Sequence, residues 1–185
     1  MGKIPDEAQK VFEGVLFDVY QWEQEMFDGS VETFEMLKRQ DTAEVLVIKD
    51  RNILLQEQEQ PSKPPFLSFP GGRIEKGEDP LDGAKREVLE ETGYESDEWE
   101  LFHEVQPTPK LKWSIFVYIA RDVTWKQEMQ LDAGERIELR WVTLDELLDL
   151  VDSGELNRIE QDLRMQLIRA KYHGPSREAL EKKLF

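Results

Sequence analysis

The 185-residue sequence contains no cysteine. Disulfide bonds, thiolate zinc sites and a cysteine nucleophile are therefore excluded. No run of residues approaches the ~20 apolar positions of a membrane span. Residues 1–6 (MGKIPD) have neither an apolar signal region nor the Ser or Thr of a myristoylation signal. We expect a cytoplasmic protein that contacts no membrane and is long enough to bury a core without a crosslink.

Basic residues are also scarce. The 24 Lys and Arg stand against 40 Asp and Glu, which gives a net charge of -16. Such a chain repels the phosphate backbone of a nucleic acid, so we expect no nucleic-acid partner. It also repels a free nucleotide, and an acidic protein that handles phosphates needs a divalent metal ion or a local basic patch. The alternative interpretation is that the charge serves solubility alone.

The hydrophobic periodicity predicts an N-terminal hairpin, with strands at 11–20 and 31–38 around the turn-like Phe27–Ser30. Further strands are predicted at 43–49, 52–57, 99–106, 113–121 and 136–143. Two helices are predicted toward the C-terminus, at 144–151 and about 156–172. Mixed strands with few helices are typical of an α/β or α+β sandwich. We divide the chain into an N-terminal extension (1–40), a main domain (41–173) and a C-terminal tail (174–185) that follows the break at Gly174-Pro175.

Residues 80–92 are predicted to form a helix with well-marked ends. Asp79 suits the N-cap, Pro80 the first helical position and Gly93 the left-handed position after the last turn. An apolar stripe that can dock on a sheet consists of Leu81, Ala84 and Val88.

Three carboxylates share one face of this helix, because Glu87, Glu90 and Glu91 stand at i, i+3 and i+4. They repel one another, and a divalent cation such as Mg²⁺, which prefers hard oxygen ligands, turns the repulsion into attraction. The backbone of Gly71 and Gly72 could add a carbonyl ligand. The alternative is a solvated Glu-rich face. Such a face more often pairs Glu with Lys or Arg four residues on, whereas Glu87 faces Glu91.

The segment Gly72–Tyr94 resembles the Nudix box, the signature Gly-x5-Glu-x7-Arg-Glu-U-x-Glu-Glu-x-Gly-U, in which U is a bulky apolar residue. Val88 fits the first U, and Tyr94 departs mildly from the aliphatic residue usual at the second. The seven fixed positions are all matched, by Gly72, Glu78, Arg86, Glu87, Glu90, Glu91 and Gly93.

The resemblance implies a Nudix α/β/α sandwich with a mixed central sheet, and a role for each matched residue. The implied metal ligands are the Gly71 carbonyl, Glu87, Glu90 and Glu91, and the implied catalytic residues include Glu90, Arg86, which holds the glutamates in place, and Glu78, which braces the loop. The implied reaction is attack of a metal-activated water on a pyrophosphate, with Mg²⁺ or Mn²⁺ as the cofactor.

Residues 11–172 most resemble the ADP-ribose pyrophosphatases within this family. The segment from Asp18-Val19-Tyr20 through Trp22 is similar to their extra N-terminal β-hairpin, which joins two subunits and helps to build the substrate pocket. The resemblance thus implies a homodimer and makes Tyr20 and Trp22 candidate substrate residues. Pro109 matches a proline of that subfamily.

The loop 132–138 (DAGERIE) resembles the place where these enzymes often carry a catalytic glutamate. Glu135 is our candidate general base and Glu138 the second choice. The alternative for Glu135 is an exposed loop charge.

Two features depart from that subfamily. Gln58-Glu59-Gln60 lacks the arginine that many relatives place after this strand, and Pro70-Gly71-Gly72 replaces their usual Pro-Ala-Gly. Arg51, Lys110 and Lys112 are the nearest basic candidates for binding substrate, although each could be an ordinary surface residue. Aromatic side chains that could stack a base, or belong to the core or an interface, are Phe17, Tyr20, Trp22, Phe66 and Trp113. We interpret His103 and His173 as structural.

The sequence therefore predicts Mg-dependent hydrolysis of a nucleoside diphosphate linked to another group. The first candidate substrate is ADP-ribose, which would be cleaved to AMP and ribose 5-phosphate. Nucleotide sugars and other nucleoside diphosphate derivatives are the alternative substrates. A non-catalytic nucleotide-binding Nudix module is the alternative of another class, although the box glutamates are all present. A purely structural acidic domain would leave the clustered carboxylates unexplained.

Overall fold

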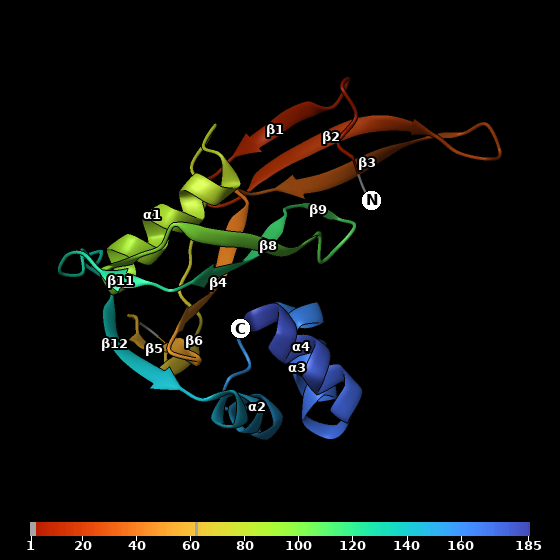
Figure 1. Cartoon of the computed structure of the whole chain (residues 1–185). Helices are drawn as coiled ribbons and strands as arrows, with labels where there is room; N and C mark the ends of the chain where they lie inside the picture. The colour runs from red at the N-terminus through yellow and green to blue at the C-terminus, as the bar shows by residue number, and fades with distance from the viewer. Residues whose placement is uncertain (1–2, 62) are drawn as a thin grey trace.

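The computed structural model describes residues 3–61 and 63–185, so the predicted extension 1–40 is described from residue 3 onward. In these residues the fold consists of two larger sheets, one two-stranded sheet and four helices, which Figure 1 shows. The N-terminal sheet contains β1 (Gln9–Glu13), β2 (Asp18–Glu25), β3 (Val31–Lys38) and β9 (Leu111–Lys112). The central sheet contains β4 (Thr42–Lys49), β5 (Asn52–Glu59), β6 (Phe66–Ser68), β8 (Glu98–Val105), β10 (Ile115–Arg121) and β12 (Arg136–Val142). A small pair is formed by β7 (Tyr94–Glu95) and β11 (Thr124–Trp125). The helices are α1 (Pro80–Thr92), α2 (Leu144–Ser153), α3 (Gln161–Tyr172) and α4 (Gly174–Leu184).

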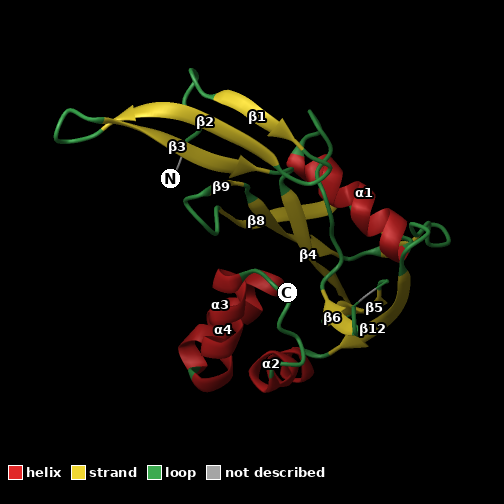
Figure 2. Cartoon of the chain, turned by 180° about the vertical axis from the view of Figure 1, so that it is seen from behind, coloured by secondary structure: helices red, strands yellow, loops and turns green. Residues whose placement is uncertain are grey.

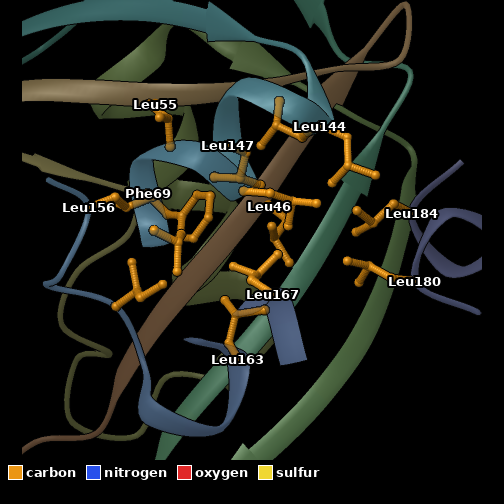
Figure 3. Packing of buried hydrophobic residues seen from close by; sticks show 14 of the residues in the cluster. Leu46, Leu55, Phe69, Leu144, Leu147, Leu156, Leu163, Leu167, Leu180 and Leu184 are labelled. Carbon is orange, nitrogen blue, oxygen red and sulfur yellow. The ribbon is translucent and has the colours of Figure 1, made fainter. Parts of the chain in front are cut away.

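The central sheet is mixed, because β10 runs parallel to β4 and antiparallel to β8. Alternate residues of β4 face opposite sides. Ala43, Val45 and Val47 pack with α1, whereas Leu46 and Ile48 pack in the core that also holds residues of α2, α3 and α4 (Figures 2 and 3). Helices therefore cover both faces, and the predicted α/β/α sandwich with a mixed central sheet is confirmed.

The predicted strand 11–20 is wrong in one respect, because the chain turns in its middle. Gly14 N donates to Phe17 O at 3.1 Å, which separates β1 from β2. A Cβ atom at Gly14 would lie 2.6 Å from that same oxygen, so the turn needs glycine. The predicted hairpin is present as β2 and β3, and β1 and β9 extend it to four strands.

Strands β4 and β5 are joined by a tight turn and then separate. Asp50 and Arg51 adopt φ angles of 49° and 60°, in the left-handed region. Beyond Ile48 and Ile53 the two strands no longer pair with each other. Residues 70–73 lie beside β4 instead, because Ala43 N donates to Gly72 O and Val45 N to Pro70 O, both at 2.9 Å. The position of residues 70–73 beside β4 brings Gly71 and Gly72 next to α1.

The segment 174–185, predicted as a tail, is the helix α4. Leu180 and Leu184 are buried in the large core, and Arg121 Nε donates to Leu184 O at 3.1 Å (Figure 3). We interpreted Gly174-Pro175 only as a break, but proline also suits the first turn of a helix. The helix predicted at about 156–172 begins later, at Gln161, after its N-cap Glu160. No helix of the described ranges has the length and hydropathy to cross a membrane.

A buried polar cluster joins the sheet to this helical layer. The Glu160 carboxylate accepts bonds from Asp162 N at 2.8 Å and Leu163 N at 2.9 Å, and it lies 2.6 Å from His103 Nε2. The Glu44 carboxylate accepts a bond from Glu160 N at 2.9 Å. Burial raises the pKa of Glu44 to about 7, and the nearby Glu160 carboxylate adds to the shift. The other histidine, His173, precedes α4 and contacts Ser176.

We predict that Glu44→Gln changes how stability depends on pH. Glu44 has a pKa of about 7 when folded against 4.5 unfolded, so the folded state holds its proton more tightly. Wild type should therefore lose stability as pH rises from about 4.5 to about 7, by roughly 2–3 kcal/mol. The Gln variant keeps an oxygen for Glu160 N but does not titrate. Urea unfolding of both proteins between pH 4.5 and 8 measures the difference, and parallel pH profiles would contradict the prediction.

Candidate active site

An open pocket of about 820 Å³ lies where α1, β5 and two loops meet. One loop runs from Gly71 to Lys76, and the other precedes β12. Polar and charged side chains dominate the lining, which includes Gln40, Gln58, Gln60, Gly71, Gly72, Arg73, Glu75, Lys76, Arg86, Glu87, Glu90, Glu91, Gln130, Asp132 and Glu135. This is the pocket that contains the predicted glutamates.

Helix α1 is fixed at both ends and along one face. The Asp79 carboxylate accepts a bond from Leu81 N at 2.9 Å, and Gly93, with φ of 73°, closes the helix through its N–H to Leu89 O. Ala84 and Val88 are fully buried against the sheet. Because this stripe is docked, the face with the three glutamates is turned toward the pocket.

Glu91 is the most deeply buried of the three glutamates, with 7% of its surface exposed. Its Oε2 accepts bonds from Gly71 N at 2.8 Å and from Gln56 Nε2 at 2.9 Å. Burial raises the pKa of Glu91 to about 8 despite these two donors, and the charges of Glu87 and Glu135 contribute. The carboxyl group is thus held in place, but no basic side chain in the described part of the chain forms a salt bridge with it.

A row of three glutamines extends from Glu91 toward the pocket mouth. Gln56 and Gln58 belong to β5 and Gln60 directly follows it, and their alternate spacing places them on one face. Gln58 Nε2 donates to Gln56 Oε1 at 2.6 Å and to Ser68 Oγ at 2.8 Å. Gln60 Nε2 donates to Gln58 Oε1 at 3.4 Å and lies 3.5 Å from Glu135 Oε1. This glutamine row connects the innermost carboxylate with the one on the opposite loop.

The two glycines of the loop allow close approach to α1. A Cβ atom at Gly72 would lie 2.5 Å from the Glu87 carboxylate, and one at Gly71 would lie 2.2 Å from Ala43 O. Gly71 also has a φ of 142°, which L-residues with side chains rarely adopt. Burial raises the pKa of Glu87, although Arg86 opposes the shift.

Arg86 is the counter-ion of this acidic site. Its Nε and Nη2 donate to the two oxygens of Glu78 at 3.0 and 3.1 Å, and its Nη1 donates to Glu87 at 2.8 Å and to Glu90 at 3.1 Å. Its Nη2 also donates to Arg73 O at 2.9 Å. The Glu78 carboxylate is the main cause of the raised pKa of Arg86, and Arg86 in turn lowers the pKa of Glu78. Arg86 therefore links the loop before α1 to the helix.

The site has the chemistry of a divalent-cation site. Its donors are hard oxygens, and the Gly71 carbonyl accepts no hydrogen bond in the described part of the chain, since β4 uses Pro70 O and Gly72 O. As they stand, no three His, Asp or Glu side chains within residues 3–61 and 63–185 are arranged to hold a metal ion. Arg86 Nη1 contacts Glu87 and Glu90, so an incoming cation would compete with this guanidinium for their oxygens.

The family of the chain follows from a match to a known family model. A model described as NUDIX domain matches residues 38–162. The chain belongs to the Nudix family. An ADP-ribose pyrophosphatase of Bacillus subtilis (strain 168) is 28% identical over 167 residues, which cover 88% of this chain and 90% of that protein. A methanol dehydrogenase activator of Bacillus methanolicus is 28% identical over 159 residues, covering 82% of this chain and 86% of that protein.

A solved structure supports the fold. The crystal structure of an ADP compounds hydrolase superposes with a TM-score of 0.72 and 18% sequence identity, over 92% of this chain and 94% of that one. The resemblance to the Nudix box and the prediction of a Nudix pyrophosphohydrolase are confirmed. Nudix hydrolases generally use divalent metal ions, which fits the oxygen donors around this pocket.

The Nudix fold brings most of the candidate residues together. Those that lie at the pocket or contact a residue lining it are Gly71, Glu78, Arg86, Glu87, Glu90, Glu91 and Glu135. Glu138, the second candidate for the base, lies elsewhere, because it is exposed on β12 opposite Glu57. Of the two candidates for the base, Glu135 is thus the one that lines the pocket, and Asp132 of the same loop lines it as well.

Other candidates lie away from the pocket. Arg51 is the clear correction, because the β4–β5 turn carries it to the far end of the sheet, where its guanidinium lies 4.4 Å from the Phe185 ring centroid. Tyr20 and Trp22 belong to β2, and Lys112 belongs to β9. None of these four residues is part of the pocket lining.

The sequence analysis missed several residues of the Nudix site. Gln56 and Gln58 are buried beside Glu91, and Arg73 and Lys76 line the pocket. The alternation of glutamine at positions 56, 58 and 60 was a visible signal, because glutamine rarely occupies a buried strand face without partners.

We predict that Gln56→Leu weakens binding of Mg²⁺ by about tenfold to a hundredfold, the usual effect of removing a residue that orients a ligand. The variant leaves Glu91 with Gly71 N as its one remaining donor. Gln21→Leu is the matched control, because Gln21 makes a bond of the same kind, 2.9 Å to Glu35, on the exposed N-terminal sheet. Calorimetric titration gives the affinity and thermal unfolding reports the fold. Equal Mg²⁺ affinity in wild type and a folded Gln56→Leu protein would contradict the prediction.

Proposed function

We propose that this Nudix enzyme hydrolyses the diphosphate of ADP-ribose, giving AMP and ribose 5-phosphate, with Mg²⁺ as the cofactor and Mn²⁺ as the alternative ion. The observation that supports this most is the convergence of Glu87, Glu90, Glu91 and Glu135 on one pocket that also holds three basic residues. The 28% identity to an ADP-ribose pyrophosphatase across most of both chains supports the choice of substrate.

The proposed ligands of the ion are the carboxylates of Glu87, Glu90 and Glu91 and the carbonyl of Gly71. When bound, the ion supplies a Lewis acid that neutralises phosphoryl charge and lowers the pKa of a water molecule. Gln56 and Gly71 N orient the Glu91 carboxylate, to which they donate at 2.9 and 2.8 Å.

The remaining roles fall to residues around these ligands. Arg86 restrains Glu87 and Glu90, and Glu78 fixes Arg86 by two bonds. The Glu135 carboxylate, on the facing loop, is proposed to accept the proton of the attacking water.

A nucleotide sugar or another nucleoside diphosphate derivative is the second candidate substrate. The glutamine row supports this second candidate. Many relatives have an arginine at the end of this strand, whereas this chain has the neutral amide of Gln60 there. A neutral donor suits a hydroxyl group as well as a phosphate. A non-catalytic module is disfavoured, because Glu87, Glu90, Glu91 and Glu135 all line the pocket.

We further propose that residues 1–40 join two copies of the chain. One row of apolar residues crosses the whole N-terminal sheet, since Phe12 pairs with Val19, Val19 with Leu37 and Leu37 with Leu111. Phe12 is 58% exposed and Leu37 is 36% exposed within one chain. Exposed apolar rows of this kind mark interaction surfaces. A dimer would place β2, with Tyr20 and Trp22, near the partner.

We predict that wild type with Mg²⁺ hydrolyses ADP-ribose faster than it hydrolyses the other nucleotides of a test panel. We also predict that Glu91→Gln loses at least ~10²-fold in turnover. The test is a panel of ADP-ribose, nucleotide sugars, dinucleoside polyphosphates and nucleoside triphosphates, with products identified by mass. Glu178→Gln, an exposed change on α4, is the control. Near-normal turnover in a folded Glu91→Gln protein would refute the mechanism, and no turnover of ADP-ribose by wild type would refute the substrate.

We also predict that a chain lacking residues 1–39 is monomeric and poorly active. Phe12→Glu tests the same surface with one substitution, because a charge on the exposed apolar row opposes self-association. Sedimentation equilibrium measures the oligomeric state and the hydrolysis assay measures activity. An active monomeric truncation would show that the proposed dimer is not needed.

A further inference from the structure

A group of basic residues lies where the N-terminal sheet meets the central sheet, and one of them, Arg73, also lines the acidic pocket. It consists of Lys38, Arg39, Arg73 and Lys112, which we call the basic strip. Lys38 and Lys112 are neighbours in the pairing of β3 with β9. Arg73 forms a β-bridge with Thr42, and Thr42 follows Arg39 by three residues in the sequence. Within the described residues, none of the four forms a salt bridge.

Arg39 is held in one position by aromatic rings. Its guanidinium carbon lies 4.5 Å from the ring centroid of Trp113 and 6.0 Å from that of Phe17. Trp113 is itself fixed, because its Nε1 donates to Thr42 Oγ1 at 3.1 Å. Arg39 Nε is buried and has no acceptor in the part of the chain that the structure describes. The clamp thus presents a preorganised cation whose hydrogen bonds remain to be made.

Arg73 connects this clamp to the pocket. It follows the glycine pair directly and lines the pocket together with Gln40, the neighbour of Arg39. The charge of Arg73 lowers the pKa of Arg39, in addition to the larger effect of burial. The two arginines are also linked by geometry, because Arg73 bridges to Thr42 and the Thr42 hydroxyl holds the Trp113 ring on which Arg39 stacks. A phosphate group can bind two such guanidinium groups at once.

We propose that Arg39 and Arg73 form a phosphate-binding subsite at the edge of the pocket, beside the glutamates. The site takes a phosphate group of the substrate, and in this respect it rests on the proposed function. Arginine suits the task because its planar fork binds two phosphate oxygens at once. The subsite offers positive charge where Gln58 and Gln60 offer none, and it relieves the repulsion between an anionic substrate and an acidic protein.

The experiment measures anion binding without metal, so it does not depend on hydrolysis. Inorganic pyrophosphate is titrated calorimetrically into the full chain in the presence of EDTA. We expect binding that weakens at least about tenfold in Arg39→Gln and in Arg73→Gln, since each removes a charge-assisted contact. Arg39→Lys keeps the charge and should retain part of the affinity. If wild type binds no pyrophosphate, or if both Gln variants bind as wild type does, the proposal is overturned.

Arg51→Gln is the matched control, because Arg51 also stacks on an aromatic ring, at 4.4 Å from Phe185, but at the far end of the sheet. It should bind pyrophosphate as wild type does. If Arg51→Gln weakens binding as much as Arg39→Gln, the effect is one of net charge and the proposal is overturned. A purely structural role of Arg39 would lower the melting temperature and leave pyrophosphate binding in the folded protein unchanged.

A second measurement identifies which phosphate occupies the subsite. KM values are compared for ADP-ribose and for ADP-ribose with an added 2′-phosphate. If the subsite holds the scissile diphosphate, Arg39→Gln raises both KM values alike. If it holds an additional phosphate, the extra group lowers KM in wild type but not in Arg39→Gln. Either result supports the subsite, and unchanged KM values for both substrates overturn it. Failure of ADP-ribose hydrolysis alone would refute the proposed function and leave the pyrophosphate result standing.

Discussion

The buried Glu91 carboxylate is the constraint on which the rest of the site depends. A carboxylate with 7% exposure is costly to bury unless donors surround it. Two neutral donors reach it, Gly71 N at 2.8 Å and Gln56 Nε2 at 2.9 Å, and they come from two segments far apart in the sequence. The glycine loop, strand β5 and helix α1 must therefore be placed correctly at the same time. Because neutral donors leave the charge uncompensated, burial still raises the pKa of Glu91, to about 8.

The charged groups around that carboxylate are paired with one another rather than with Glu91. Arg86 neutralises the outer glutamates and anchors them to Glu78, but no contact of Arg86 with Glu91 is formed. Within the described residues Glu91 forms no salt bridge, and the metal ion proposed for this site would supply the missing positive charge. Outside the acidic group, the clamped Arg39 supplies positive charge that points to an anionic partner. As proposed, the pocket would hold a cation and an anion side by side, as cleavage of a charged diphosphate requires.

Much of the fold could be predicted from local patterns. Helix α1 begins and ends as expected, because Asp79, Pro80 and Gly93 act through bonds within a few residues of themselves. The split between β1 and β2 could not be predicted from the apolar run that contains it, since the turn at Gly14 depends on one contact with Phe17 O. Helix α4 was missed for a different reason. Its weak amphipathic pattern becomes stable only where Leu180 and Leu184 reach the core formed by other segments.

The sequence by itself determined that Glu87, Glu90 and Glu91 share a helix face, because helical spacing is a local property. It also determined that the chain carries the Nudix box. Only the tertiary structure decided which other residues meet these glutamates. It placed Glu135 and the glutamine row at the pocket, moved Arg51 to the opposite end of the sheet and set Arg39 on the ring of Trp113. These outcomes depend on how β4 and β5 separate and on what lies between them, and such long-range pairings leave no periodic signal in the sequence.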